Sequence, residues 1–381
     1  MENNEYKFTK SHTQIAKGVA ITLMMFYHLF AFPDRIQGVS YISIMPHFLQ
    51  SIFSSNSVEF FLADFGKICV AMYLFLSGYG LYLSSCSKKK FTIMDSCKKM
   101  IKFMKNYWTV FIIFVPIGLI FFRNSSQYHF NIIVFMKNFF TLSSSYNGEW
   151  WFVRLYIELL LVFPLVKLIL KRKIIFSCAI ISGLYIISIG MEGIFKILPQ
   201  LSFLEKTLLY HDIKSLLFWQ MTFCIGCLTA KFDVFGYINK CALKKKLDNK
   251  VFYIAMILLI VLVRLGFTKV FWIIGKSDAT SVDFILAPLF ILVCTNFIAN
   301  NRSKNVFLLL GKHSTNMWLT HSFFCYYYFQ KFVFMPKFSI LIVIWLAILS
   351  LCSSIFIDFV IKSFSVLQEK FIRIKKRKVL T

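Results

Sequence analysis

Two histidines inside apolar segments are the side chains of this chain best placed to do chemistry. His28 lies eleven positions after Lys17 in the segment KGVAITLMMFYH, and His321 ends the segment TNMWLTH. An imidazole with an ordinary pKa of about 6.5 can accept or donate a proton at neutral pH. An ionisable side chain is costly within a membrane span, so each histidine indicates a functional site. The alternative is a neutral histidine that only hydrogen-bonds to a neighbouring helix.

Arg154 and Glu158 form the next candidate group. They are four residues apart, so a helix places them on one face, where their charges can neutralise each other. Trp150 and Trp151 precede them and match an interfacial anchor, which by itself would explain both tryptophans. A structural ion pair explains Arg154 and Glu158 as well as a binding site does.

Other polar residues indicate a functional site less clearly. Ser77 and Gly78 form a small-residue notch where helices can approach closely or a ligand can enter. Arg264 and Asp358 suit a structural ion pair as well as a functional role. His313 is expected at the cytoplasmic interface, in contact with solvent.

The composition predicts the class of protein that positions these side chains. The 381 residues are 58% hydrophobic and only 16% charged, whereas soluble domains carry about 25% charge. The apolar runs approach the roughly 20 residues that a helix needs to cross a bilayer. We therefore expect an all-α integral membrane protein, a polytopic bundle of about ten transmembrane helices. The ten predicted spans are residues 14–32, 65–84, 106–122, 150–170, 174–190, 214–230, 251–267, 282–299, 315–330 and 339–361.

The lysines and arginines between these spans predict the orientation. Alternate connecting segments, beginning with residues 1–17 and ending with 362–381, hold 29 of them, and the segments between hold only 9. Basic residues favour the cytoplasmic side, so both termini are expected in the cytoplasm of a cell whose plasma membrane the chain crosses many times. Residues 1–361 would form one membrane domain, and 362–381 a basic cytoplasmic tail.

The composition argues against several classes of function. The net charge of +26 fits orientation signals and attraction to anionic membrane lipids, so no nucleic-acid partner is expected. Cys224 and Cys227 have CxxC spacing, but they sit in an apolar span with no second pair, which favours core packing. No metal site and no bound cofactor are expected.

The order of these motifs resembles the acyltransferase-3 family, ten-span membrane acyltransferases, many of which O-acetylate bacterial surface glycans. The similarity extends over nearly the whole length. The family begins with a basic residue, ten intervening positions and a catalytic histidine, and it continues with a Ser-Gly-aromatic motif, a tryptophan-led span that ends in proline, and a Gly-Lys-x-Ser turn before a later histidine. The matching residues here are Lys17, His28, Ser77, Gly78, Tyr79, Trp150, Glu158, Pro164, Gly311, Lys312, Ser314, Trp318 and His321.

The resemblance implies acyl transfer from a cytoplasmic acyl-CoA, with acetyl-CoA as the expected donor substrate, to a sugar hydroxyl. His28 would remove the hydroxyl proton or briefly carry the acyl group, Glu158 would orient a histidine or the sugar, and His321 would line the acceptor pocket. Ser77, Tyr79, Trp150 and Arg154 are further expected pocket residues.

Lys17, Lys102 and Lys105 are expected to bind the donor phosphates. Many members of the family carry an Arg-x-x-Arg pair where this chain has Lys102-Phe-Met-Lys105. Lysine keeps the charge but lacks the bidentate fork of arginine, so a donor-binding role for this pair departs from the family pattern.

The acceptor is expected to be a cell-surface polysaccharide or its lipid-linked oligosaccharide precursor. About twenty residues follow the last span, so either the membrane domain completes the transfer or a separate extracytoplasmic protein receives the acyl group. The competing interpretation is a proton-coupled transporter or glycan exporter, since buried His, Arg and Glu also suit a carrier. Paired halves with matching broken helices, which many carriers have, are not seen in the sequence.

Overall fold

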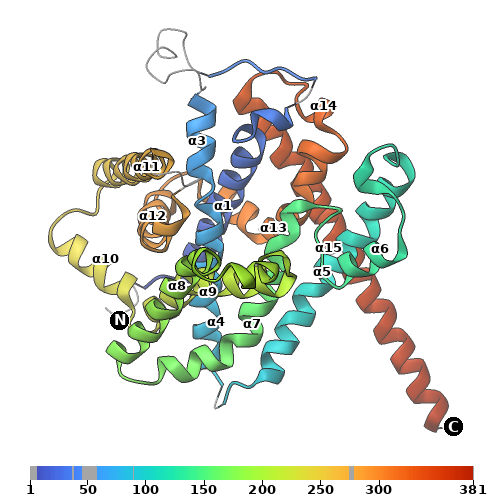
Figure 1. Ribbon diagram of the computed structural model, residues 1–381, viewed down its shortest axis with the longest axis horizontal. Helices are drawn as coiled ribbons and strands as arrows, with labels where there is room; N and C mark the ends of the chain where they lie inside the picture. The colour runs from blue at the N-terminus through green and yellow to red at the C-terminus, as the bar shows by residue number, and fades with distance from the viewer. Residues whose placement is uncertain (1–6, 37, 45–57, 89, 274–278, 381) are drawn as a thin grey trace. The chain divides into compact units, whose positions relative to one another are not determined.

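The structure is a computed structural model that describes residues 7–36, 38–44, 58–88, 90–273 and 279–380. These residues are almost entirely helical, and they form no strand beyond an isolated bridge between Ile42 and Phe338. The chain is therefore an all-α polytopic membrane protein. The α-helices are α1 Lys10–Phe30, α3 Val58–Gly66, α4 Cys69–Cys86, α5 Ile93–Phe121, α6 Ile132–Phe139, α7 Trp151–Leu170, α8 Ile174–Ile197, α9 Leu208–Lys231, α10 Val234–Lys244, α11 Lys250–Ile273, α12 Asp283–Ala299, α13 Lys304–Ser322, α14 Gln330–Val333 and α15 Ser339–Leu380 (Figure 1).

All ten predicted spans coincide with helical structure. Within the described part of the chain, seven helical segments are long and apolar enough to cross a membrane: Val58–Cys86, Ile93–Phe121, Ile174–Met191, Leu208–Lys231, Lys250–Ile273, Thr280–Ala299 and Ser339–Val366. The other three predicted spans coincide with α1, α7 and α13. These three helices carry the polar candidates His28, Arg154, Glu158 and His321, which reduce their hydrophobicity. The count of ten spans stays a prediction.

The described residues cluster in two compact units. Unit 1 comprises Met1–Tyr27, Phe60–Lys98 and Phe152–Lys312, and unit 2 comprises His28–Glu59, Lys99–Trp151 and His313–Thr381. α1 and α13 each contribute one part to unit 1 and one part to unit 2.

In unit 1, α9 packs against α4, α8, α10 and α12, and α11 packs against α12. Glycines set the close approach of α4 and α9. A Cβ atom at Gly78 would overlap the carbonyl oxygen of Phe223, and one at Gly226 would overlap that of Phe75. Small residues let helix backbones approach closely in membrane proteins. The notch predicted at Gly78 is therefore a site of helix contact.

In unit 2, α13 ends in a π-helix, Phe323–Tyr327, which packs against α14 and α15. The short α6 is held against α5 because Tyr107 Oη donates a hydrogen bond of 2.6 Å to the Asn138 carbonyl. A π-helical turn is rare and often marks a functional site, because it redirects side chains within a helix. This turn begins two residues after His321.

The α4–α9 contact leads to a stability prediction with an internal control. Gly78→Ala is expected to lower the free energy of unfolding by about 1–3 kcal/mol, because the methyl group is forced into the α9 backbone. Gly80→Ala, on the same helix with nothing within 4 Å of the added atom, is expected to be neutral or to stabilise by up to about 1 kcal/mol. Thermal unfolding in detergent measures both. Equal effects of the two substitutions would contradict the assignment.

Candidate active site

His28 and His321 contact each other in unit 2. Nδ1 of His28 lies 2.6 Å from Nε2 of His321, and the two rings stack with centroids 4.8 Å apart. The histidines are 293 residues apart in the chain, and they are only 7% and 0% exposed. The structure therefore brings together two of the three residues predicted to be catalytic.

Glycines in α1 and α13 explain how the two histidines come into register. In unit 1, a Cβ atom at Gly18 would overlap the Phe307 carbonyl, and one at Gly311 would overlap the Gln14 carbonyl. Gly18 and Gly311 are also separated by 293 residues, as are the histidines, so each histidine lies ten residues beyond its glycine. The repeated Gly-x9-His spacing is a sequence signal for this pairing that the motif analysis missed.

Glu149 supplies the carboxylate of the site. Its Oε2 lies 3.0 Å from His28 Nε2, and its Oε1 lies 3.1 Å from an Arg35 nitrogen. Glu149 belongs to a short 3-10 helix, Gly148–Trp150, whose cap Asn147 accepts a hydrogen bond from the Glu149 amide at 3.1 Å. The sequence analysis did not select Glu149, although it precedes Trp150 directly. The available signal was an acidic residue at the start of a predicted span.

Three hydrogen bonds attach this loop to the end of α13 and to the π-helix. They are Asn147 Nδ2 to Ser322 Oγ at 2.7 Å, Gly148 N to Tyr327 Oη at 3.0 Å, and Trp150 Nε1 to the Leu319 carbonyl at 3.1 Å. Trp150, predicted as a pocket residue, is buried and positions the Glu149 backbone in this way. Glu149 is thus tied to the same helix as His321.

The hydrogen-bond partners limit where the protons of the site can lie. His321 Nδ1 lies 2.7 Å from the Trp318 carbonyl oxygen, which only accepts, so Nδ1 carries a proton. Nε2 of a neutral His321 then accepts from His28 Nδ1, and a third proton lies between His28 Nε2 and Glu149. Three hydrogen bonds in the array, His28, His321 and Glu149, therefore need three protons, one more than two neutral imidazoles hold.

Charges on both sides of Glu149 keep its carboxylate ionised. Burial would raise its pKa, but the opposite charges of His28 and Arg35 outweigh burial and lower the pKa of Glu149 to about 2. The Arg35 guanidinium lies 4.1 Å from the ring centroid of Phe32 and 4.9 Å from that of Tyr326. Gln330 donates a hydrogen bond of 2.7 Å to the Arg35 carbonyl. Arg35 is 44% exposed, so it links the buried array to solvent.

Glu158 lies in unit 1, where its partner is an arginine. Arg154 Nε donates to Glu158 Oε1 at 3.2 Å, and Arg154 also pairs with Asp212. The predicted Arg154–Glu158 pair therefore exists, with a second carboxylate that the sequence did not suggest. The carboxylate on His28 is that of Glu149, and an orienting role for Glu158 stays a prediction. Arg154 has one buried guanidinium nitrogen, NH1, with no hydrogen-bond partner among the described residues.

The other predicted pocket residues in unit 1 bond to backbone groups. Ser77 Oγ donates to the Tyr73 carbonyl on its own helix at 2.7 Å, and Tyr79 Oη donates to the Phe8 carbonyl at 3.4 Å. Their hydroxyl groups thus stabilise local structure. A substrate contact for either residue stays a prediction.

The lysines predicted to bind the donor fall into two groups. Lys17 is on α1 in unit 1, one residue before Gly18. Lys102 and Lys105 are exposed on α5 in unit 2, three residues apart and hence on one helix face. Their exposed amines could contact a soluble anionic ligand.

Two groups left ambiguous by the sequence have buried partners. Arg264 donates two hydrogen bonds to Asp283, at 2.8 and 3.0 Å, and both side chains are almost fully buried in unit 1. The expectation that His313 contacts solvent is wrong. In unit 2 it is 8% exposed, 3.1 Å from Ser354 Oγ and 3.2 Å from Asp358 Oδ2, because α15 covers that face of α13.

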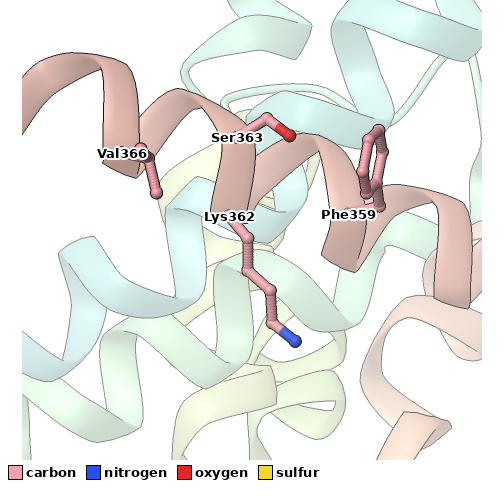
Figure 2. Close-up of a pocket in the computed structure, with 4 residues that line it drawn as sticks. All are labelled: Phe359, Lys362, Ser363 and Val366. Atoms are coloured by element: carbon pink, nitrogen blue, oxygen red, sulfur yellow. The ribbon is translucent and has the colours of Figure 1, made fainter.

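An open hollow along α15 is lined by Phe359, Lys362, Ser363 and Val366, all on one helix, and Figure 2 shows the Lys362 side chain extending away from the helix. A hollow with walls from a single helix cannot enclose a ligand. Among the described residues, no group of three or more His, Cys, Asp or Glu side chains is arranged to hold a metal ion.

Comparison with known proteins gives one match. A family model described as an acyltransferase domain, acyltransferase family 3, matches residues 14–359 of the 381. This range contains His28, His321 and Glu149. It also contains every predicted span except the last two residues of the tenth span. No curated protein and no solved structure matches the chain significantly.

The buried Arg264–Asp283 pair predicts a structural role separate from the histidine array. Arg264→Met is expected to lower the free energy of unfolding by about 3–5 kcal/mol, because it removes both hydrogen bonds that Arg264 donates to the buried Asp283 charge. The double substitution Arg264→Met with Asp283→Leu should recover most of that loss. Thermal unfolding in detergent measures both variants. A single variant as stable as the wild type would rule out the pairing.

Proposed function

The chain belongs to the acyltransferase-3 family, and we propose that this membrane acyltransferase moves an acetyl group from acetyl-CoA to a hydroxyl of a bacterial cell-surface polysaccharide or its lipid-linked precursor. The observation that carries the proposal is the buried array of His28, His321 and Glu149, with contacts of 2.6 and 3.0 Å. Such an array can take and return one proton, as acyl transfer to a hydroxyl requires.

In the proposed reaction the array works as a base and then as an acid. In the two-proton state His28 keeps its proton on Nε2, where Glu149 accepts it, so His28 Nδ1 accepts the proton of the acceptor hydroxyl while the hydroxyl oxygen attacks the thioester carbon. The carbon–sulfur bond then breaks, and His28 Nδ1 returns the proton to the departing CoA thiolate. General acid–base catalysis of this kind contributes about 10²–10⁴-fold. The array with three protons would be the state between these two steps.

Glu149 would stabilise the imidazolium and fix the orientation of the His28 ring, as the carboxylate of a catalytic triad does. Arg35 would hold the other oxygen of Glu149. His28 as a transient acyl carrier is a second route for the same residue. It requires acyl transfer to a ring nitrogen of His28 before the hydroxyl attacks.

Other residues would serve the two substrates. Lys17, Lys102 and Lys105 would contact the phosphates of the donor, and Arg154 with its unused nitrogen would contact the acceptor. The donor is cytoplasmic, which fits cytoplasmic termini, ten spans of the plasma membrane and a basic tail at residues 362–381. Either the membrane domain completes the transfer, or a separate extracytoplasmic protein receives the acyl group.

Removal of His28 tests the proposed function directly. His28→Ala is expected to abolish acetylation while the amount of protein in the membrane is unchanged, because it removes the imidazole that contacts both His321 and Glu149. Alkali-labile acetate on the surface glycan is compared among wild type, a deletion strain and the His28→Ala strain. Equal acetate in all three strains would exclude glycan acetylation. Proton-dependent flux without acetyl-CoA consumption would favour a transporter.

Substitutions of Glu149 and Glu158 provide a matched comparison of the two candidate carboxylates. Glu149→Gln keeps the shape of the side chain but removes the charge opposite His28, so we expect acetyl transfer to fall by about 10²–10⁴-fold. Glu158→Gln is expected to have a smaller effect, because its charge partner is Arg154. Transfer of labelled acetate from acetyl-CoA by each purified variant measures both. A larger loss with Glu158→Gln would assign the orienting role to Glu158.

A further inference from the structure

A second polar site lies in unit 1, separate from the histidine array. A cleft of about 210 Å³ opens between the start of α1, α10, the start of α11 and the end of α12. Its polar lining includes His12, Asn239, Asp248, Tyr253, Asn296 and Asn300. None of these residues has a part in the proposed acid–base chemistry.

The amides and the carboxylate of this cleft are held in place by one another. Asn296 Nδ2 donates to Asn239 Oδ1 at 2.8 Å, which connects α12 to α10. Tyr253, which is buried, donates its hydroxyl proton to Asp248. These bonds fix two amides, which can donate and accept hydrogen bonds, and one carboxylate, which accepts them, in one small space.

His12 contributes a neutral ring. The Thr9 amide donates to His12 Nδ1 at 3.1 Å, so Nδ1 is an acceptor and the ring proton is on Nε2. Burial and the charge of Lys304 lower the pKa of His12, which favours this neutral form. The ring also stacks on Phe8 with centroids 5.4 Å apart. His12 thus presents a hydrogen-bond donor on a fixed aromatic ring.

The size and chemistry of the cleft fit a purine base. Sites that enclose a whole ligand usually measure about 300–1,000 Å³, so this cleft suits one ring system. Asparagine amides pair with the amine and ring nitrogen of adenine, and a carboxylate can accept from the same amine. Lys7 lines the cleft and Lys304 acts on His12, so positive charge is available for attached phosphates.

We propose that this cleft binds the adenine of the acyl-CoA donor, an assignment that rests on the proposed function. The chain segments that form the cleft are lysine-rich segments that are expected in the cytoplasm. The donor is also found in the cytoplasm.

The test compares a whole donor with a truncated one, using the full-length protein in phospholipid nanodiscs. Asn296→Leu is expected to raise KM for acetyl-CoA by about tenfold, because it removes one hydrogen bond to the ligand. We expect kcat to change little. KM for acetyl-pantetheine, which lacks the nucleotide, should not change. Asn305→Leu, exposed on α13 outside the cleft, is the control. Equal changes for both donors, or no change for either, would overturn the assignment.

A direct binding measurement tests the adenine cleft independently of the proposed acetyl transfer. Titration calorimetry with adenosine 3′,5′-bisphosphate should show saturable binding to the wild type, and weaker binding to Asn296→Leu and to the milder Tyr253→Phe. No binding, or equal binding by all three proteins, would exclude the cleft. Binding by a wild-type protein that transfers no acetyl group would support the cleft and refute the proposed acetylation.

Discussion

Two imidazoles and a carboxylate can be buried among apolar helices only if they satisfy one another. An unpaired polar group in such surroundings costs several kcal/mol, and an unpaired charge costs more. His28, His321 and Glu149 meet this requirement with three hydrogen bonds that run from a backbone carbonyl to the carboxylate. The close packing of α1 on α13 and the anchored Glu149 loop both serve this arrangement, because each brings one member within reach of another.

The need to satisfy buried polar groups also applies to the helices outside the seven most clearly membrane-spanning segments. α1, α7 and α13 carry ionisable or strongly polar side chains and are not among the seven segments apolar enough to span a membrane by themselves. Helices of this kind depend on neighbours, which must cover their polar faces. The seven more apolar segments can meet the lipid directly.

A second buried group of charges lies in unit 1. Arg264 and Asp283 form a bidentate pair in unit 1 with almost no exposure, which suits structure more than reaction. The histidine array differs because its number of protons can change while its partners remain in place. Arg154, with two carboxylate partners and one unused nitrogen, is intermediate between these cases.

The sequence by itself determined the class of the protein, the positions of its helices and the candidacy of His28 and His321. These conclusions follow from local properties, since hydropathy and helical spacing are set within about twenty residues. Only the tertiary structure decided that Glu149 is the carboxylate on His28, that Asp212 is a second partner of Arg154, and that His313 is buried. These contacts join residues that are 121, 58 and 45 positions apart, respectively. Helix packing and loop attachment fix such contacts, and hydropathy and helical spacing do not encode them.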